Sequence, residues 1–216
     1  MIVFKGLMMA AKKNCILRLS RYKNELYRFK KLGFIKIFSE YLAEAVGVTS
    51  AQVRKDFSLF DISGNKRGGY TIDAILDKLN SILGKNQIQK VVVVGAGNLG
   101  SALLRYKNFE KQGIRITAAF DIDPAKGLQK FSTPVHPMTD LESFLRVNGI
   151  KIGILCVPEV AAQSVFDAMV RAGIRGVLNF SPIQLKTPVD CIVTNVNLEV
   201  ELENLIYFVT AGNSTK

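Results

Sequence analysis

The 216-residue chain has no tryptophan, a single histidine and three cysteines. The cysteines, Cys15, Cys156 and Cys191, are too few and too far apart for a disulfide framework or a zinc site, and they suit a reducing, cytoplasmic environment. With His136 as the one histidine, the sequence offers no Ser/His/Asp or Cys/His arrangement and no metal-ligand cluster. We therefore expect neither a bound metal nor nucleophilic catalysis.

Long apolar runs are also missing. The longest runs, such as residues 91–96, have the length of a strand and fall well short of the roughly 18 residues of a membrane span. Lys5 interrupts the mildly apolar start, and Lys12 and Lys13 follow it, which argues against a signal peptide. Hydrophobic residues are 48% and charged residues 22% of the chain, the composition of a folded protein with ample material for a core.

Acidic residues are scarce in the first part of the chain. Residues 1–85 contain sixteen Lys and Arg against seven Asp and Glu, whereas residues 86–216 contain thirteen against eleven. A basic segment beside a nearly neutral one indicates a polyanion-binding module joined to a second domain. A merely solubilising surface is the alternative explanation of the charge. We predict two domains, residues 1–84 and 85–216.

The basic segment shows the pattern of three helices. Apolar residues recur at helical spacing over 16–29, Ser39 is placed to cap a second helix that ends at Gly47, and Thr49 and Gln52 form a capping box for a third. Two helices joined by a short glycine turn are typical of a helix-turn-helix, although a generic helical hairpin remains the alternative. The third helix offers side chains that bond base edges or phosphates in a major groove: Ser50, Gln52, Arg54 and Lys55.

A glycine-rich basic turn follows at residues 63–70. It lies between short apolar segments and predicts a β-hairpin whose tip presents Lys66 and Arg67. A wing of this kind lets a cation reach the DNA backbone or a narrow minor groove. A solvated loop is the alternative. A further amphipathic helix over 72–83 then leads to a junction at 84–87.

The second domain opens with the most specific motif in the chain. The buried strand at 90–94 runs directly into a G-x-G-x-x-G turn and an apolar-faced helix, the arrangement of a dinucleotide-binding fold. Gly95 permits the tight turn, Gly97 lets a pyrophosphate approach the backbone, and Gly100 lets helix and strand pack closely. The predicted phosphate-binding residues are Gly95, Ala96, Gly97, Asn98, Leu99 and Gly100.

A second strand, residues 114–120, ends at Asp121. A dinucleotide fold places an acid here to bond the adenosine ribose, with Ile122 beside it, and a carboxylate would repel the 2′-phosphate of NADP. We therefore favour NAD(H) over NADP(H), with a helix cap or a turn residue as the structural alternative for Asp121. Alternating strands and helices continue to a last helix over 197–208, which predicts an α/β fold with a doubly wound, Rossmann-like parallel sheet.

Ligands of such folds lie at the carboxyl ends of the strands. This rule places Val157, Pro158 and Asn179 in the wall of the nucleotide pocket, although Val157 and Pro158 are equally well explained as a strand end. No proton donor or acceptor of the kind a hydride-transferring enzyme needs is evident, since His136 is expected at the surface.

Five segments together resemble the Rex family of redox-sensing transcriptional repressors. They cover the third helix, the wing, the glycine turn, the end of the second strand and a later strand end: 53–60, 66–70, 94–103, 120–124 and 178–182. The resemblance extends over nearly the whole chain after about residue 15.

The resemblance implies a homodimer that binds pseudopalindromic operators of fermentation and respiration genes and releases them when NADH rises, with NAD⁺ competing weakly. It implies that the helix over 49–60 enters the major groove and Arg67 the minor groove. The C-terminal helix would be exchanged between subunits. Tyr106 matches a tyrosine near the nicotinamide, where we expect it and Leu198 to close the pocket.

One departure from the family concerns the link between the domains. Some members join them through an Arg/Asp ion pair, and the matching positions here are Asn24 and Asn197. We hypothesise that an amide hydrogen bond replaces the pair, or that coupling runs elsewhere. Two other function classes stay open: an NAD-dependent oxidoreductase with a helical oligomerisation domain, and a regulator that reads coenzyme A or ATP through the same glycine turn.

Overall fold

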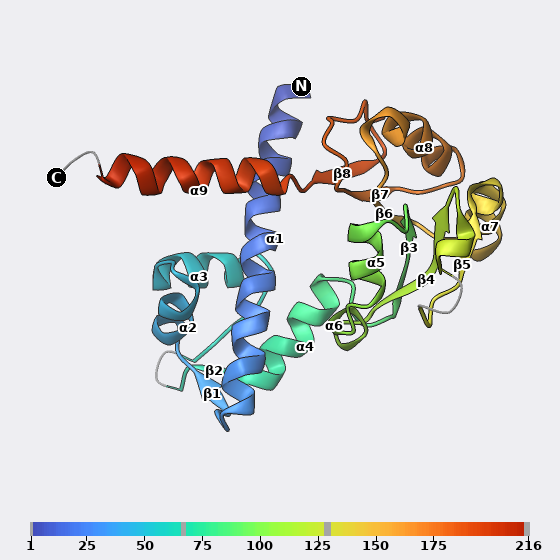
Figure 1. Cartoon of the computed structure of the whole chain (residues 1–216). Coiled ribbons are helices and arrows are strands. Elements are labelled where there is room, and N and C mark those ends of the chain that lie inside the picture. The colour runs from blue at the N-terminus through green and yellow to red at the C-terminus, as the bar shows by residue number, and fades with distance from the viewer. Residues whose placement is uncertain (1, 66–67, 128–130, 214–216) are drawn as a thin grey trace. The chain divides into compact units, whose positions relative to one another are not determined.

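The chain divides into two compact units, residues 1–87 and 88–216 (Figure 1). The structure is a computed structural model and describes residues 2–65, 68–127 and 131–213. Each unit has its own hydrophobic core. Among the described residues, none of the helices is long and apolar enough to cross a membrane.

The first unit is a small helical domain with a two-stranded sheet. Its elements are α1 (Ile2–Lys31), β1 (Lys36–Ile37), α2 (Ser39–Val46), α3 (Ser50–Ser58), β2 (Tyr70–Thr71) and α4 (Ile72–Ile82). The core lies between these elements, where the ring of Phe57 contacts the rings of Tyr22 and Tyr70 edge-on, with centroids 5.6 and 5.2 Å apart. This packing of α3 against α1 and β2 fixes which face of α3 remains in solvent.

The turn between α2 and α3 is set by two capping residues. Gly47 ends α2 with φ of 73°, a left-handed conformation that favours glycine, and Thr49 begins α3 by accepting a hydrogen bond from the Gln52 amide at 3.1 Å. The prediction that Ser39 caps α2 is wrong. Phe38 occupies the cap position without a side-chain bond, and Ser39 is the first helical residue, with its hydroxyl 3.3 Å from Glu40 Oε1.

The wing differs from a simple local hairpin. β2 pairs antiparallel with β1, a two-residue strand that precedes α2, while Asn65 and Gly69 form only an isolated bridge at the base of the turn. The strand partner therefore comes from a distant part of the sequence, as in a winged helix. Lys66 and Arg67, the residues predicted at the tip, lie outside the described residues.

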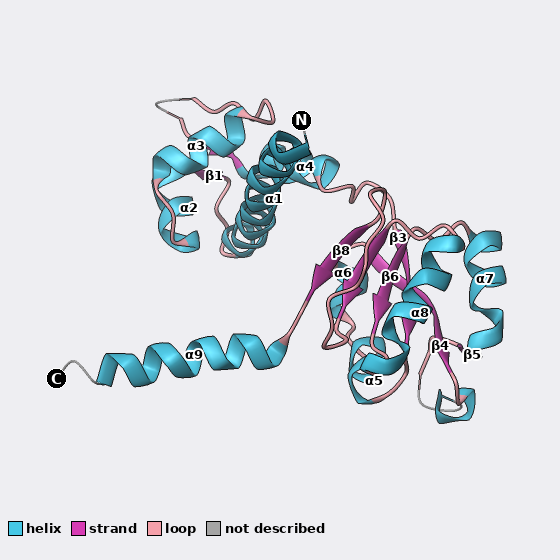
Figure 2. Cartoon of the chain, turned by 90° about the horizontal axis from the view of Figure 1, so that it is seen from above, coloured by secondary structure: helices cyan, strands magenta, loops and turns pink. Residues whose placement is uncertain are grey.

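The second unit is a parallel six-stranded sheet flanked by helices (Figure 2). Its strands are β3 (Gln89–Val94), β4 (Ile114–Asp121), β5 (Val135–Pro137), β6 (Ile152–Leu155), β7 (Gly176–Asn179) and β8 (Ile192–Asn195). Their order, β5-β4-β3-β6-β7-β8, is that of a dinucleotide-binding Rossmann sheet, in which the strand order reverses beside the first strand. The predicted α/β fold is confirmed.

Alternation along β3 separates two apolar layers. Val92 and Val94 face a core that α7 (Leu141–Asn148) and α8 (Glu159–Arg171) cover. Val91 and Val93 face the opposite side, where α5 (Asn98–Leu104) contributes its apolar residues. Because both faces of a parallel sheet are buried, the strand reads as a continuous apolar run. The remaining helices of the unit are α6 (Asn108–Lys111), η1 (Pro124–Gly127), η2 (Met138–Asp140) and α9 (Leu198–Asn213).

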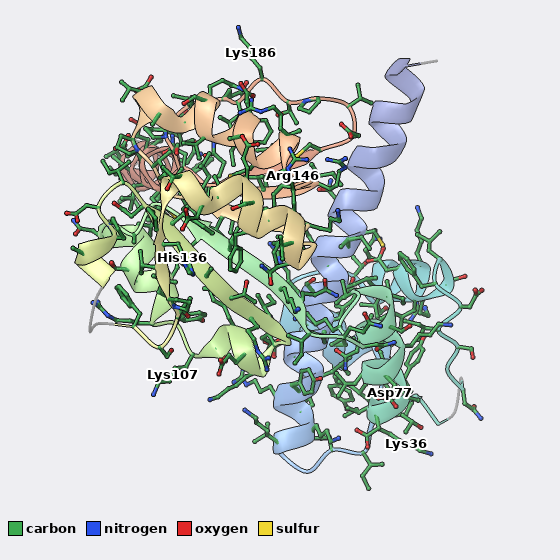
Figure 3. The ribbon with its side chains drawn as sticks, turned by 90° about the vertical axis from the view of Figure 1, so that its right-hand side faces the viewer. Lys36, Asp77, Lys107, His136, Arg146 and Lys186 are labelled. Carbon is green, nitrogen blue, oxygen red and sulfur yellow. The ribbon has the colours of Figure 1, made fainter. Side chains whose placement is uncertain are left out.

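His136 does not lie in a surface loop as predicted. It belongs to the edge strand β5, is half-buried (Figure 3), and packs its ring against the rings of Phe120 and Phe144, with centroid distances of 5.6 and 5.4 Å. This ring contact accounts for the histidine as part of the core that α7 covers.

Candidate functional site

The glycine turn after β3 is built from three glycines with different roles. Gly95 has φ of 95°, and a Cβ there would lie 2.3 Å from the Cys156 carbonyl oxygen. A Cβ at Gly100 would lie 1.9 Å from the carbonyl oxygen of Gly95. Both positions therefore require glycine for the turn itself. Gly97 is different, because a Cβ there would meet nothing within 4 Å.

This open space at Gly97 is what a ligand cradle requires. The packing of the protein gives no reason for glycine at this position, whereas a pyrophosphate approaching the backbone does. Gly97 and Asn98 are exposed, Leu99 is half-buried, and Ala96 is buried behind them. The turn thus exposes Gly97 and Asn98 to solvent between Gly95 and Gly100, the two tightly packed glycines.

Asp121, at the end of β4, holds the glycine turn from the neighbouring strand. Its Oδ2 accepts a hydrogen bond from the Ala96 amide at 2.7 Å, and its Oδ1 accepts one from the Asp123 amide at 2.9 Å. Each carboxylate oxygen can accept a further bond. The side chain is therefore fixed by the backbone and still able to accept hydroxyl groups.

A cavity of about 590 Å³ adjoins these residues at the carboxyl ends of the strands. Its lining joins residues from the glycine turn, from the end of β4 and from the start of α8: Gly95, Gly97, Leu99, Asp121, Ile122, Met138, Cys156, Val157, Pro158, Val160, Ala161, Val165 and Phe180. Most of these side chains are apolar, and Asp121 is the one carboxylate among them. Burial raises the pKa of Cys156 to about 12, so this thiol is neutral in the cavity wall.

Some predicted pocket residues lie elsewhere. Asn179 is fully buried, and its amide bonds the carbonyl oxygens of Ser181 and Ile183 and the Oδ1 atom of Asn195, so it organises the loop after β7. Tyr106 is exposed and packs its ring edge-on against Phe109.

Neither Asn179, Tyr106 nor Leu198 is among the described residues that line the cavity. The prediction that Asn179 forms part of the wall is therefore corrected to a structural role in the neighbouring loop. Tyr106 and Leu198 do not close the cavity within a single chain.

In the first unit, α3 presents two cations to solvent. Lys55 and Arg54 are exposed, and Ser50 is half-exposed at the first turn of the helix. The Arg54 guanidinium donates to Ser39 Oγ at 2.9 Å and to Glu40 Oε1 at 3.1 Å, which orients it against α2. The arrangement places positive charge on the face of α3 that points away from the core.

Sequence reasoning missed Asp56, a fully buried residue on the inner face of α3. Arg18 of α1 donates to both of its oxygens, at 2.6 and 2.7 Å, and Tyr22 Oη donates at 2.9 Å. Gln52 Nε2 donates at 2.8 Å from one turn earlier in α3, and Cys15 Sγ at 3.4 Å. We call these five residues the Asp56 network. Val53, Asp56 and Phe57 form the buried stripe of α3. The three-residue spacing from Val53 to Asp56 was the signal in the sequence that Asp56 would be buried.

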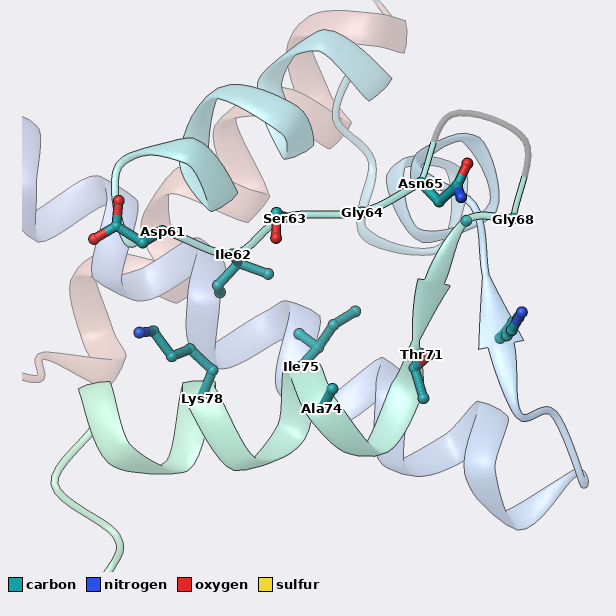
Figure 4. Close-up of a pocket in the computed structure, with 12 residues that line it drawn as sticks. Asp61, Ile62, Ser63, Gly64, Asn65, Gly68, Thr71, Ala74, Ile75 and Lys78 are labelled. Atoms are coloured by element: carbon teal, nitrogen blue, oxygen red, sulfur yellow. The ribbon is translucent and has the colours of Figure 1, made fainter.

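A second cavity, of about 720 Å³, lies beside the wing (Figure 4). Its described lining includes Asp61, Ser63 and Asn65 from the approach to the wing and Lys78 from α4. Polar and apolar side chains share this lining, and among its described residues none is a buried charged group.

Comparison with protein families matches both units. Residues 13–58 match the family described as "Putative DNA-binding protein N-terminus", and residues 86–183 match the "CoA binding domain" family. A curated relative from Carboxydothermus hydrogenoformans, a "Redox-sensing transcriptional repressor Rex", is 43% identical over 193 residues, which cover 89% of this chain and 93% of the relative. The chain belongs to the Rex family of redox-sensing transcriptional repressors.

Other Rex relatives support the same assignment. The repressor from Clostridium botulinum strain Alaska E43 is 39% identical over 89% of this chain and 92% of its own. A crystal structure of RSP with NAD⁺ and operator DNA matches with a TM-score of 0.88 at 38% identity, covering 93% of each chain. RSP with NADH matches with a TM-score of 0.83 at 37% identity, covering 93% of this chain and 95% of RSP. The Clostridium relative is named as a transcriptional repressor, and RSP is described as a Rex-family repressor.

The two asparagines that replace the ion pair of some Rex members belong to different units. Asn24 is exposed on α1. Asn197 caps α9, because its Oδ1 accepts hydrogen bonds from the amides of Glu199 at 3.0 Å and Val200 at 3.2 Å. The Oδ1 atom of Asn197 is therefore engaged at the start of the last helix.

Proposed function

We propose that this chain represses transcription by binding operator DNA through α3 and the wing, and that it releases the DNA when NADH binds beside the glycine turn. The observation that carries the proposal is the combination, in one chain, of exposed cations on α3 and a glycine turn left open at Gly97. The family membership supports both halves.

The first unit supplies the DNA-binding half. Ser50, Arg54 and Lys55 lie on the solvent face of α3, the helix that follows the glycine turn of a helix-turn-helix. The sequence adds two further cations, Lys66 and Arg67, to the segment that we assign to the wing. Contacts to phosphates give affinity that depends on salt, and contacts to base edges give sequence preference.

The second unit supplies the nucleotide half. Gly97 leaves room for the pyrophosphate, Asp121 accepts the ribose hydroxyls, and Ile122, Val157 and Pro158 form apolar walls. The carboxylate of Asp121 disfavours a 2′-phosphate, which selects NAD(H) over NADP(H). A charged oxidised nicotinamide loses more hydration in apolar surroundings than the neutral reduced ring, which favours NADH.

The last helix indicates a homodimer. Every described side chain of α9 is exposed, including a row of large apolar residues at helical spacing: Leu198, Leu202, Leu205, Ile206 and Val209. A monomer rarely leaves a contiguous apolar face of this kind in water. A second copy of the chain, exchanging α9 with the first, would cover it and give two copies of α3 for the two halves of a palindromic operator.

Release of DNA then follows from linkage between the two sites. NADH weakens DNA binding only if it prefers a dimer geometry in which the two α3 helices no longer match the spacing of the half-sites. By the same linkage, operator DNA lowers the affinity for NADH by an equal factor.

A binding experiment tests the proposal. The full-length protein is mixed with duplexes selected from its own promoter regions, and NADH, NAD⁺ and coenzyme A are titrated in separately. We expect salt-dependent binding of a palindromic duplex that NADH weakens more than NAD⁺ and that coenzyme A leaves unchanged. Equal effects of NADH and NAD⁺, or release by coenzyme A instead, would contradict it.

A further inference from the structure

Gln52 differs from the other polar residues on α3 because its side chain is already held by the protein. It is half-buried near the start of the helix, and its Nε2 donates to Asp56 Oδ1 at 2.8 Å. The carboxylate that receives this bond is fully buried and anchored by both nitrogens of the Arg18 fork and by Tyr22. The carboxylate of Asp56, which accepts from the Gln52 amide, is therefore held in place by Arg18 and Tyr22.

The chemistry of this bond allows one orientation of the amide. Burial alone would raise the pKa of Asp56, but hydrogen bonds from Arg18, Tyr22 and Gln52 outweigh it and hold that pKa below its usual range. Asp56 is thus an ionised carboxylate, which only accepts hydrogen bonds. The amide nitrogen of Gln52 must face Asp56, and the carbonyl oxygen must face the other way.

The outward carbonyl oxygen is available to a ligand. Within the described part of the chain, no group donates a hydrogen bond to Gln52 Oε1, and no buried side-chain oxygen lacks a partner, so this atom is in solvent. Gln52 is the third residue of α3, two residues after Ser50 and three before Lys55. Residues at the start of a recognition helix are the ones that contact base edges.

We propose that Gln52 selects a base carrying an exocyclic amine, adenine or cytosine, and that Asp56 is the positioning residue that enforces this choice. A glutamine that can turn its amide offers either an acceptor or a donor to the major groove. Adenine N6 and cytosine N4 are donors there, whereas guanine O6 and thymine O4 are acceptors. With its oxygen fixed outward, Gln52 accepts a hydrogen bond from the amine of adenine or cytosine. It does not direct its amide nitrogen toward guanine O6 or thymine O4.

This inference deepens the proposed function and rests on it, since it concerns the DNA that α3 would bind. The Asp56 network also gives the buried carboxylate of Asp56 a structural role. It connects the amide of Gln52 to α1 through Arg18 and Tyr22. The orientation of the amide is thus built into the fold before DNA arrives.

The test uses base analogues, so the wild-type protein itself is measured. The full-length chain first selects duplexes from a randomised library. Each adenine in the preferred half-site is then replaced by purine, and each cytosine by 2-pyrimidinone, which removes only the exocyclic amine. We expect one position in each half-site where this change weakens binding about tenfold, within the range for one base contact.

Two variants identify the residue responsible. In Q52M, whose side chain has similar length but no amide, removing the amine at that position should change the affinity less than twofold. In D56N, position 56 can offer either an oxygen or an amide nitrogen, so Gln52 can turn and the selected base should broaden to include guanine and thymine. If D56N does not fold, the Q52M variant alone tests whether Gln52 contacts the exocyclic amine.

The outcomes separate the two levels of the argument. A wild-type chain that selects no duplex overturns the repressor proposal, and this inference with it. A chain that binds its selected duplex, yet responds to loss of each amine just as Q52M does, overturns the inference alone. An unchanged base preference in a folded D56N variant overturns the positioning role of Asp56.

Discussion

Arg18 and Asp56, 38 residues apart in sequence, form a two-pronged ion pair inside the first unit. Arg18 Nε lies 2.6 Å from Asp56 Oδ2, and Arg18 Nη2 lies 2.7 Å from Oδ1. This geometry matches the fork of a guanidinium to the two oxygens of a carboxylate. The pair ties α1 to α3, and so ties the helix that we assign to DNA binding to the longest helix of the unit.

Removing Arg18 should destabilise the first unit strongly. In R18M the carboxylate of Asp56 stays buried without its main cation, which costs about 3–5 kcal/mol for a buried pair. Urea unfolding followed by tyrosine fluorescence measures the change. The matched control is K30M, which breaks the exposed Lys30–Asp73 pair and should leave the free energy of unfolding almost unchanged. Similar stabilities of the two variants would contradict the structural importance of the buried pair.

The glycines of the turn should separate folding from ligand binding. Alanine at Gly97 meets open space, so G97A should unfold at the temperature of the wild type but bind NADH at least tenfold more weakly, because its Cβ occupies the pyrophosphate position. Alanine at Gly100 collides with the Gly95 carbonyl, so G100A should lose both thermal stability and binding. Thermal unfolding and calorimetric NADH titration give the two readouts. Wild-type affinity in G97A would argue against the cradle.

A charge on α9 should break the proposed dimer without harming the fold. Leu205 is 60% exposed in the single chain and contributes to no core, so L205E removes no contact within the unit. In a dimer the same carboxylate would be buried without a partner, which costs several kcal/mol. Light scattering should show a dimer for wild type and for the control E201Q, and a monomer for L205E. A dimer that survives L205E would place the interface elsewhere.

Lys23 should give the first unit a stability that rises with pH. It is 3% exposed, and burial together with neighbouring Lys85 lowers its pKa to about 8. Between this value and about 10.4, the pKa of an unfolded lysine, the unfolded chain binds more protons, so stability increases with pH. Below pH 8 both states are protonated and the gain is absent.

The variant K23M tests this dependence. Thermal unfolding measured from pH 7 to pH 9 should show a rising midpoint for wild type, and K23M should lack the part of the rise that comes from Lys23. A parallel rise in both proteins would assign the effect to another group.

The parts of the fold that could be predicted are those with strong local patterns. The apolar run of β3, the glycine turn and the caps at Gly47 and Thr49 all depend on neighbouring residues, and the structure has each of them where the sequence places it. The alternation of strands and helices predicts the parallel sheet, whereas the order of its strands comes from the structure.

The rest depends on contacts between distant residues. β1 and β5 are two and three residues long, too short for a period, and each exists because a remote strand pairs with it. The position of Asp56 on the buried stripe of α3 was visible in the spacing. Its partner Arg18 was not, because nothing in the sequence near α3 indicates which side chain of α1 would reach it. Phe38 takes the cap position before α2 for the same reason, since its backbone continues from β1.

The exposed helix α9 has a consequence for how such a regulator responds to its own abundance. Sixteen residues are close to the length at which an isolated helix is only marginally stable in water. None of the described side chains of α9 is buried in its own unit, so in the proposed dimer the helix would gain most of its stability from the second copy. Its folding and the assembly of the repressor would then be one event. In the dilute limit the concentration of such a dimer would fall with the square of the subunit concentration, and a modest drop in synthesis would leave unoccupied the operators that a monomeric repressor would still bind.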